Sequence, residues 1–235
     1  MKILVAGGNG GIGWAIVQEI GRRFPTAEVH ATYRRQKPDV HQSGVIWHQV
    51  DVSDESQIRS LSESVCEVDW VINCIGMLHI KDKGPEKNLS SLDAEFFLQS
   101  VAVNTLPTML LARYFTPALK RSHSPKFASI SAKVGSISDN QLGGWYSYRA
   151  SKAALNMFLK TMSIEWRRTV KHGVVLALHP GTTDTPLSAP FQANVPSNKL
   201  FKPQRVASDL IRLIEKAAPQ ESGAFWAYDG ESLPL

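Results

Sequence analysis

The sequence has few cysteines and no long apolar run, and these absences exclude several classes of protein. Only Cys66 and Cys74 occur among its 235 residues. Two thiols cannot supply a disulfide framework for a chain of this length, and no metal-ligand spacing is present, so we expect no metal site. No segment approaches the roughly 18 consecutive apolar residues of a membrane span, and the apolar start, residues 1–6, reaches glycine too early for a signal peptide. We expect a cytoplasmic protein that has no membrane partner.

The charge is mildly positive and dispersed. The net charge is +5 at pH 7, and the densest basic clusters are the pairs Arg34-Arg35 and Arg167-Arg168. No basic face and no recognisable nucleic-acid-binding module accompany them, so we expect no nucleic-acid partner. The mildly positive net charge is compatible with binding of an anionic small molecule, such as a phosphorylated cofactor. The length and the hydrophobic content of 43% suit one large α/β domain over residues 1–235.

Short apolar runs alternate with longer helical patterns, which favours a parallel sheet with crossover helices. We expect strands at residues 2–6, 28–33, 45–49, 70–74, 126–130, 174–178 and 224–228. We expect helices at residues 12–23, 55–64, 92–120 (broken near Pro107), 146–168 and 204–216. Segments 77–91 and 182–202 fit neither pattern. They follow strands, at the ends where ligands bind in open α/β sheets, so we expect substrate loops, with tolerated surface insertions as the alternative.

A glycine-rich turn joins the first expected strand to the first expected helix. It reads Gly7-Gly8-Asn9-Gly10-Gly11-Ile12-Gly13. Two registers fit: GxGxxG through Gly8, Gly10 and Gly13, and GxxxGxG through Gly7, Gly11 and Gly13. A turn in this place brings backbone N–H groups and a helix N-terminus to a pyrophosphate, and a purely structural turn is the alternative. The expected cofactor contacts in this turn are Gly7, Asn9, Gly10, Gly11, Ile12 and Gly13.

The second expected strand ends in two arginines instead of an acid. A NAD site usually places Asp or Glu about 20 residues after the glycines, to bind the ribose hydroxyls. No acid lies between His30 and Lys37, and Arg34 and Arg35 stand there instead. An acid would repel a 2′-phosphate, whereas a guanidinium can pair with it bidentately. The sequence therefore favours NADP(H) over NAD(H), with two solvated arginines as the alternative.

Tyr148 and Lys152 lie four residues apart in a segment rich in helix-forming residues, so they share one helical face. A phenol has an ordinary pKa of about 10, too high for proton transfer at neutral pH. A nearby ammonium lowers that pKa and can make the tyrosine a general acid/base. A surface tyrosine and a solvated lysine on one helix would be the alternative.

These residues together resemble the short-chain dehydrogenase/reductase family over nearly the whole chain. The matches in its glycine loop are Gly7, Gly11 and Gly13, with Ala6 where threonine is usual. The later matches, in order, are Asp51 on the adenine side, residues 73–76 as a degenerate NNAG motif, Asn104 of the catalytic tetrad, Tyr148 and Lys152 as the YxxxK motif, and Pro180-Gly181 followed by Thr183 and Thr185. Within the family, segments 135–137 and 143–149 look like the sniffer-type carbonyl reductases and the C-factor-like proteins.

The resemblance implies a Rossmann-type, doubly wound parallel sheet of about seven strands, with helices on both faces. It also implies further cofactor contacts, at Asp51, Val52, Asn73, Ile75, Gly76, Pro180, Gly181, Thr183 and Thr185. In the implied reaction NADPH delivers a hydride to the carbonyl carbon of a small ketone or aldehyde, and Tyr148 protonates the oxygen. Lys152 lowers the pKa of Tyr148 and binds the nicotinamide ribose, while Asn104 holds a relay water. Family members commonly form dimers or tetramers through helices corresponding to residues 92–120 and 146–168.

One departure concerns the family's catalytic serine. It normally lies three residues before the glycine, which here is the position of Ala132 in the segment Ser131-Ala132-Lys133-Val134-Gly135. We expect Ser131 to donate to the carbonyl oxygen from one residue earlier, although neighbouring side chains of a strand point to opposite faces. Ser136 and Ser138 are the alternative donors.

Two other functions stay open. The chain can be a non-catalytic dinucleotide-binding signalling or regulatory protein of C-factor type, which Ala132 favours and the retention of Asn104, Tyr148 and Lys152 opposes. A sugar-nucleotide epimerase shares the YxxxK motif, but 235 residues leave little room for its substrate domain. Apolar residues of segment 182–202, Phe191 among them, suggest an apolar lid that excludes few carbonyl compounds.

Overall fold

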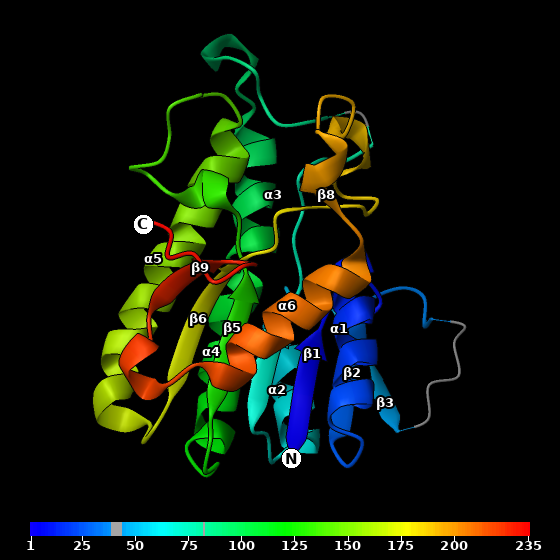
Figure 1. Cartoon of the computed structure of the whole chain (residues 1–235), viewed down its shortest axis with the longest axis vertical. Coiled ribbons are helices and arrows are strands. Elements are labelled where there is room, and N and C mark those ends of the chain that lie inside the picture. The colour runs from blue at the N-terminus through cyan, green and yellow to red at the C-terminus, as the bar shows by residue number, and fades with distance from the viewer. Residues whose placement is uncertain (39–43, 82) are drawn as a thin grey trace.

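A parallel sheet forms the centre of the molecule (Figure 1). The computed structural model describes residues 1–38, 44–81 and 83–235, so residue 82 of the predicted loop 77–91 lies outside the described residues. Within these ranges the sheet has seven strands. From edge to edge they are β3 (Val45–Gln49), β2 (Glu28–Tyr33), β1 (Lys2–Ala6), β4 (Trp70–Asn73), β5 (Lys126–Ile130), β6 (Val174–His179) and β9 (Ala224–Ala227). Every neighbouring pair is parallel.

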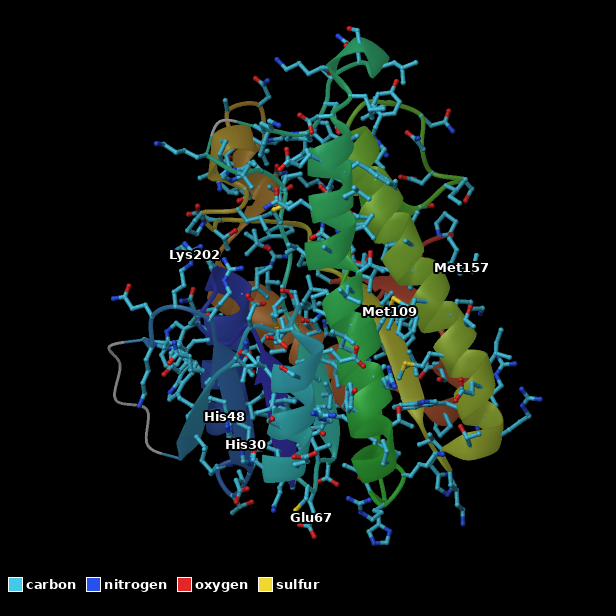
Figure 2. The ribbon with its side chains drawn as sticks, turned by 180° about the vertical axis from the view of Figure 1, so that it is seen from behind. His30, His48, Glu67, Met109, Met157 and Lys202 are labelled. Atoms are coloured by element: carbon cyan, nitrogen blue, oxygen red, sulfur yellow. The ribbon has the colours of Figure 1, made fainter. Side chains whose placement is uncertain are left out.

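Helices cover both faces of the sheet, as Figures 1 and 2 show from opposite sides. One face carries α1 (Gly11–Arg23) and α6 (Pro203–Lys216), and the other carries α2 (Glu55–Ser64), α4 (Leu106–Leu119) and α5 (Tyr146–Thr169). Successive side chains of β1 point to opposite faces, so Ile3 and Val5 pack with α1 and α6 while Leu4 and Ala6 pack with α2, α4 and α5. The predicted doubly wound Rossmann-type fold is confirmed.

The predicted helix 92–120 is two helices in the structure. Helix α3 (Ala94–Asn104) ends at Thr105, whose φ of −116° and ψ of −54° begin a new helix axis at α4. Pro107 then lies in the first turn of α4, where its missing N–H costs no hydrogen bond. The break therefore comes just before the proline, since a proline starts a helix more readily than it continues one.

Short elements add detail that the sequence patterns did not reveal. Inside the predicted loop 182–202, β7 (Thr182–Thr183) pairs with β8 (Leu200–Phe201), which holds the two ends of that loop together. Single helical turns lie at Leu89–Ser91, Lys133–Gly135, Ala189–Phe191, Ser197–Lys199 and Pro219–Glu221. Strands of two residues and turns of three are too short to show a hydrophobic period.

The strand order reverses between β1 and β4, because the chain first moves outward to β2 and β3 and then returns. Ligands of open α/β sheets bind in the crevice at the carboxyl ends of the strands at such a reversal. The segments that follow β1, β4, β5 and β6 all begin at that edge. Within the described residues, no helix has the length and apolar character needed to cross a membrane.

Candidate active site

The turn after β1 requires glycine at two positions. Gly7 has a φ of +75°, and a Cβ atom there would lie 2.7 Å from Cγ1 of Ile75, which follows β4. A Cβ atom at Gly13 would lie 2.1 Å from the carbonyl oxygen of Gly7. The turn is closed by a hydrogen bond from the Gly10 N–H to that same oxygen, at 3.0 Å. The missing side chains thus let the first turn of α1 lie directly on the loop.

The N-terminus of α1 has the character of an anion site. Its cap residue is Gly10, which offers no side-chain acceptor, and its first turn holds no acid. In the described part of the chain, no acceptor is hydrogen bonded to the N–H groups of Gly11 and Ile12. These donors and the helix dipole favour a phosphate group. The residues present therefore fit the pyrophosphate of a dinucleotide.

The residues after β6 lie against this helix end. Gly181 has a φ of +70°, and a Cβ atom there would lie 2.7 Å from the ring of Phe201. The chain can turn there toward α1 only because Gly181 has no side chain. A Cβ atom at Gly11 would lie 2.6 Å from Cγ2 of Thr185. Pro180 and Thr183 complete the turn, with the Thr183 hydroxyl donating to the Pro180 carbonyl at 3.4 Å.

The structure brings together Arg34, which follows β2, and Asp51, which follows β3. Their closest charged atoms, Nη1 and Oδ2, lie 3.9 Å apart. Asp51 also accepts from the N–H and the hydroxyl of Ser53, at 3.0 and 2.6 Å, and the hydroxyl bond is the largest cause that lowers the pKa of Asp51. Asn9 of the glycine turn donates to the carbonyl of Gln36 at 3.2 Å, which holds the segment after β2 beside the turn.

Two of the remaining cofactor predictions, at the residues next to Arg34 and Asp51, differ in exposure. Arg35 is exposed, whereas Val52 is buried at 6% exposure and packs in the hydrophobic core. Contact of either residue with a nucleotide stays a prediction.

Asn73 shapes the exit from β4. Its Oδ1 atom accepts from the N–H of Ile75 at 3.1 Å, and its Nδ2 atom donates to the Thr108 hydroxyl at 2.8 Å. The bond from the Ile75 N–H turns the chain toward Gly76. A Cβ atom at Gly76 would lie 3.5 Å from Oδ1 of Asn104 and 3.6 Å from Nζ of Lys152. Gly76 therefore lies where Asn104 and Lys152 meet.

Asn104 is fully buried at the end of α3. Its Oδ1 atom accepts from the N–H of Met77 at 2.7 Å, and its Nδ2 atom donates to the Met77 carbonyl and to the Ser151 hydroxyl, both at 2.9 Å. The amide thus ties the segment after β4 to α5, one residue before Lys152. Its predicted role in holding a relay water stays a prediction.

Tyr148 and Lys152 lie together in the buried first turns of α5. The Nζ atom of Lys152 lies 5.9 Å from the centre of the Tyr148 ring and donates to the carbonyl of Ile130, at the end of β5, at 2.9 Å. Burial lowers the pKa of Lys152 to about 8. Burial also raises the pKa of Tyr148 above its ordinary value. This differs from the lowering that we expected, because burial disfavours the phenolate, and the Lys152 ammonium donates to the Ile130 carbonyl and not to the phenol oxygen.

Ser131 has a partner inside the protein. Its hydroxyl donates to Oδ1 of Asn156 at 2.6 Å, eight residues beyond Tyr148 along α5. Within the described residues, Nδ2 of Asn156 is the buried side-chain nitrogen or oxygen without a hydrogen-bond partner. This geometry does not favour the prediction that Ser131 donates to a substrate carbonyl, which stays a prediction. Of the alternative donors, Ser136 accepts from the Asp139 N–H at 3.2 Å, and Ser138 donates to the Leu235 carbonyl at 3.0 Å.

Two residues that the sequence patterns missed lie beside Tyr148. Glu86, at 4% exposure, accepts from the N–H of Ser147 at 3.0 Å, and Trp145 places its ring 6.1 Å from the Tyr148 ring. The glycine pair before Trp145 signals a turn, but it does not indicate where the ring points. Nothing in the sequence around Glu86 distinguishes it from a surface acid.

Comparison with known proteins agrees with this geometry. The model of the short chain dehydrogenase family matches residues 1–196. The 1-hydroxy-2-glutathionyl-2-methyl-3-butene dehydrogenase of Rhodococcus sp. (strain AD45) is 30% identical over 238 residues, which cover 98% of each chain. The C-signal protein of Myxococcus xanthus is 30% identical over 179 residues, which cover 75% of this chain and 99% of its own.

Solved structures show the same fold. The NADPH-bound carbonyl reductase from chicken fatty liver superimposes with a TM-score of 0.87 at 24% identity, covering 100% of this chain and 94% of its own. The carbonyl reductase Sniffer of D. melanogaster gives a TM-score of 0.86 at 21% identity, covering 100% and 99%. The predicted resemblance to sniffer-type and C-factor-like proteins is confirmed. With most of its length matched by the family model, this chain belongs to the short-chain dehydrogenase family and is an NAD(P)-dependent oxidoreductase.

Proposed function

We propose that this chain is an NADP(H)-dependent oxidoreductase that transfers a hydride between nicotinamide and the carbonyl or alcohol group of a small molecule. The observation that carries the proposal is the buried cluster of Asn104, Tyr148 and Lys152 at the sheet edge that also carries the glycine turn. A buried tyrosine and lysine beside a phosphate-type cradle have no evident structural need, and perturbed pKa values of this kind gather at functional sites.

The cofactor supplies the hydride when it is bound. The turn at residues 7–13 and Thr185 would hold its pyrophosphate, and Arg34 with Arg35 would hold the 2′-phosphate. The carbonyl reductase from chicken fatty liver was solved with NADPH bound, which supports this choice. Gly76 leaves room for the nicotinamide end near Lys152, since a side chain there would approach the Nζ atom.

Tyr148 is the proposed proton donor. Burial raises its pKa, so the phenol stays protonated at neutral pH, which is the form that reduction of a carbonyl requires. In the described residues no group is hydrogen bonded to the Tyr148 hydroxyl, which leaves it for a substrate oxygen. Lys152, with its pKa of about 8 and its Nζ atom 5.9 Å from the centre of the Tyr148 ring, would keep the phenol supplied with a proton, and Asn104 fixes the backbone of Met77 nearby.

A non-catalytic dinucleotide-binding protein of C-factor type is the second candidate. The 30% identity to C-signal and the alanine at position 132 favour it. The engagement of Ser131 with Asn156 adds to this case, because no serine is then assigned to the substrate oxygen. The presence of Asn104, Tyr148 and Lys152 together in the buried site is the argument against it.

We further propose a cytoplasmic homodimer or homotetramer, with loops 77–91 and 182–202 bounding the substrate. Apolar side chains stand exposed on α3, α4 and α5, among them Leu98 at 66%, Met109 at 41% and Met157 at 65%. Figure 2 labels Met109 on α4 and Met157 on α5. Contact between copies of the chain would cover them, in agreement with the predicted pairing helices.

NADPH binds more tightly than NADH in this account, by roughly tenfold to a hundredfold, because a charged bidentate partner is worth a few kcal/mol. The double variant Arg34→Ala with Arg35→Ala removes the preference and leaves NADH binding nearly unchanged. Fluorescence titration of both cofactors measures it. Equal dissociation constants for the wild-type protein would contradict the assignment.

Tyr148→Phe loses carbonyl reduction by about 10² or more while NADPH still binds, because only the proton donor is removed. Tyr146→Phe is the matched control, since Tyr146 is exposed at the start of the same helix. Initial rates of NADPH oxidation on a panel of ketones and aldehydes give the comparison. Wild-type rates in the Tyr148 variant would show that another group protonates the oxygen.

Lys152→Met changes how stability depends on pH. The pKa of Lys152 is about 8 in the folded state and ordinarily 10.5, so below pH 8 the folded protein carries the full cost of a buried ammonium, on the order of 3 kcal/mol. That cost falls as pH rises from 8 toward 10.5, because in this range the folded protein has released the proton that the unfolded chain still holds. The stability of the variant relative to wild type therefore falls between pH 7 and pH 10. Urea unfolding at several pH values tests this, and a difference independent of pH would refute it.

The variants Ser131→Ala and Ala132→Ser test whether Ser131 donates a hydrogen bond to the substrate carbonyl. Because the Ser131 hydroxyl donates to Asn156, we expect Ser131→Ala to change turnover by only a few-fold, and Ala132→Ser to raise it. A loss of about 10² in Ser131→Ala, the scale of one oxyanion donor, would instead restore the prediction from the sequence. Tight NADPH binding without turnover in wild type and in Ala132→Ser would favour the non-catalytic candidate.

A further inference from the structure

Trp145 has a backbone conformation that a bulky residue rarely adopts. Its φ is 54° and its ψ is 41°, in the left-handed region, directly after Gly143 and Gly144, each with a φ of 64°. Glycine enters this region freely, but tryptophan does so only where its surroundings hold it there. Such strain gathers at functional sites, and Trp145 lies three residues before Tyr148.

Glu86 and Arg149 hold the strained segment from two sides. The N–H of Trp145 donates to the Glu86 carbonyl at 2.5 Å, and the Ser147 N–H and hydroxyl both donate to the Glu86 carboxylate. The guanidinium of Arg149 donates to the carbonyls of Gly143 and Gly144, at 3.1 and 3.0 Å. Glu86 is nearly fully buried and has no ion pair among the described residues, so its carboxylate serves the start of α5. These bonds fix the backbone of Trp145 directly before Tyr148.

Three rings from three separate segments lie in succession from Tyr148: Trp145 contacts Tyr148, Phe191 contacts Trp145, and His79 contacts Phe191. The Trp145 ring lies 6.1 Å from the Tyr148 ring at 72°, and 5.3 Å from the Phe191 ring at 60°. Phe191 belongs to loop 182–202, and its ring lies 5.9 Å from that of His79, in loop 77–91, at 61°. We call His79, Trp145 and Phe191 the aromatic box. Each of the three is only half-buried, so part of each ring can still meet a ligand.

We propose that Trp145 determines substrate specificity, and that the aromatic box binds an aromatic ring attached to the substrate's carbonyl carbon. The inference rests on the proposed function, because it takes Tyr148 as the proton donor to that carbonyl. The exposed parts of these half-buried rings stack with a flat aromatic group more favourably than with a saturated ring of the same size. The substrate class is therefore the aryl ketones and aryl aldehydes.

The test compares two ketones of matched size, a phenyl methyl ketone and a cyclohexyl methyl ketone, with NADPH and the full chain. Trp145→Leu lowers kcat/KM for the phenyl ketone by about fivefold to tenfold, mainly through KM, and leaves the cyclohexyl ketone nearly unchanged. Trp145→Phe keeps a ring and keeps most of the preference. Comparing each variant with wild type on the same ketone cancels the difference in intrinsic reactivity.

Two further variants distinguish the loss of a ring contact from a general folding defect. Phe191→Leu removes the neighbouring ring from another loop and should shift the two ketones in the same direction. Phe97→Leu, an exposed ring on α3 outside the aromatic box, should shift neither. Equal losses on both ketones, or no loss on either, would overturn the inference while leaving carbonyl reduction intact. If wild type binds NADPH but reduces neither ketone nor any other carbonyl compound, the proposed function fails and the inference fails with it.

Discussion

The burial of Lys152 is the constraint on which the rest of the site depends. A cationic side chain away from water must find acceptors, and here its ammonium donates to the Ile130 carbonyl at the end of β5. The backbone segments that pack around Lys152 therefore have little room for added side chains. A Cβ atom at Gly135 would lie 2.7 Å from the Cβ atom of Lys152, and one at Gly76 would lie 3.6 Å from its Nζ atom. Asn104 then closes the loop after Gly76 by binding both backbone groups of Met77.

Chain topology explains why residues so far apart in the sequence meet at this point. Parallel strands deliver every following segment to the same edge of the sheet, and the reversal between β1 and β4 opens a crevice there. The glycine turn takes one side of the crevice and α5 takes the other. Loops 77–91 and 182–202 follow β4 and β6, on the same side of the reversal, and meet through His79 and Phe191. The proposed cofactor and substrate surfaces are thus adjacent, as hydride transfer would require.

The sequence predicted the elements with a strong period and the positions with a backbone requirement. Strand and helix bounds agreed to within a few residues, because buried parallel strands and amphipathic helices leave clear patterns, and Gly7 and Gly13 are required by the backbone of the turn. The hydrogen-bond and ring partners of individual side chains could not be predicted from the sequence. The bond from Ser131 to Asn156, the capping of α5 by Glu86 and the ring position of Trp145 depend on tertiary contacts that no local pattern encodes. The direction of the Tyr148 pKa was missed for the same reason, since the burial that raises it depends on tertiary packing.

The central claim is that this site moves a hydride between a nicotinamide and a carbonyl carbon. It is tested most directly with NADPH carrying deuterium at one of the two C4 positions, with the wild-type protein and a carbonyl compound, by mass and NMR analysis of the product. The account predicts deuterium on the carbinol carbon from one of the two labelled cofactors and not from the other, because a fixed pocket presents one face of the ring. Absence of label in any product, with NADPH bound and a broad range of carbonyl compounds supplied, would contradict it.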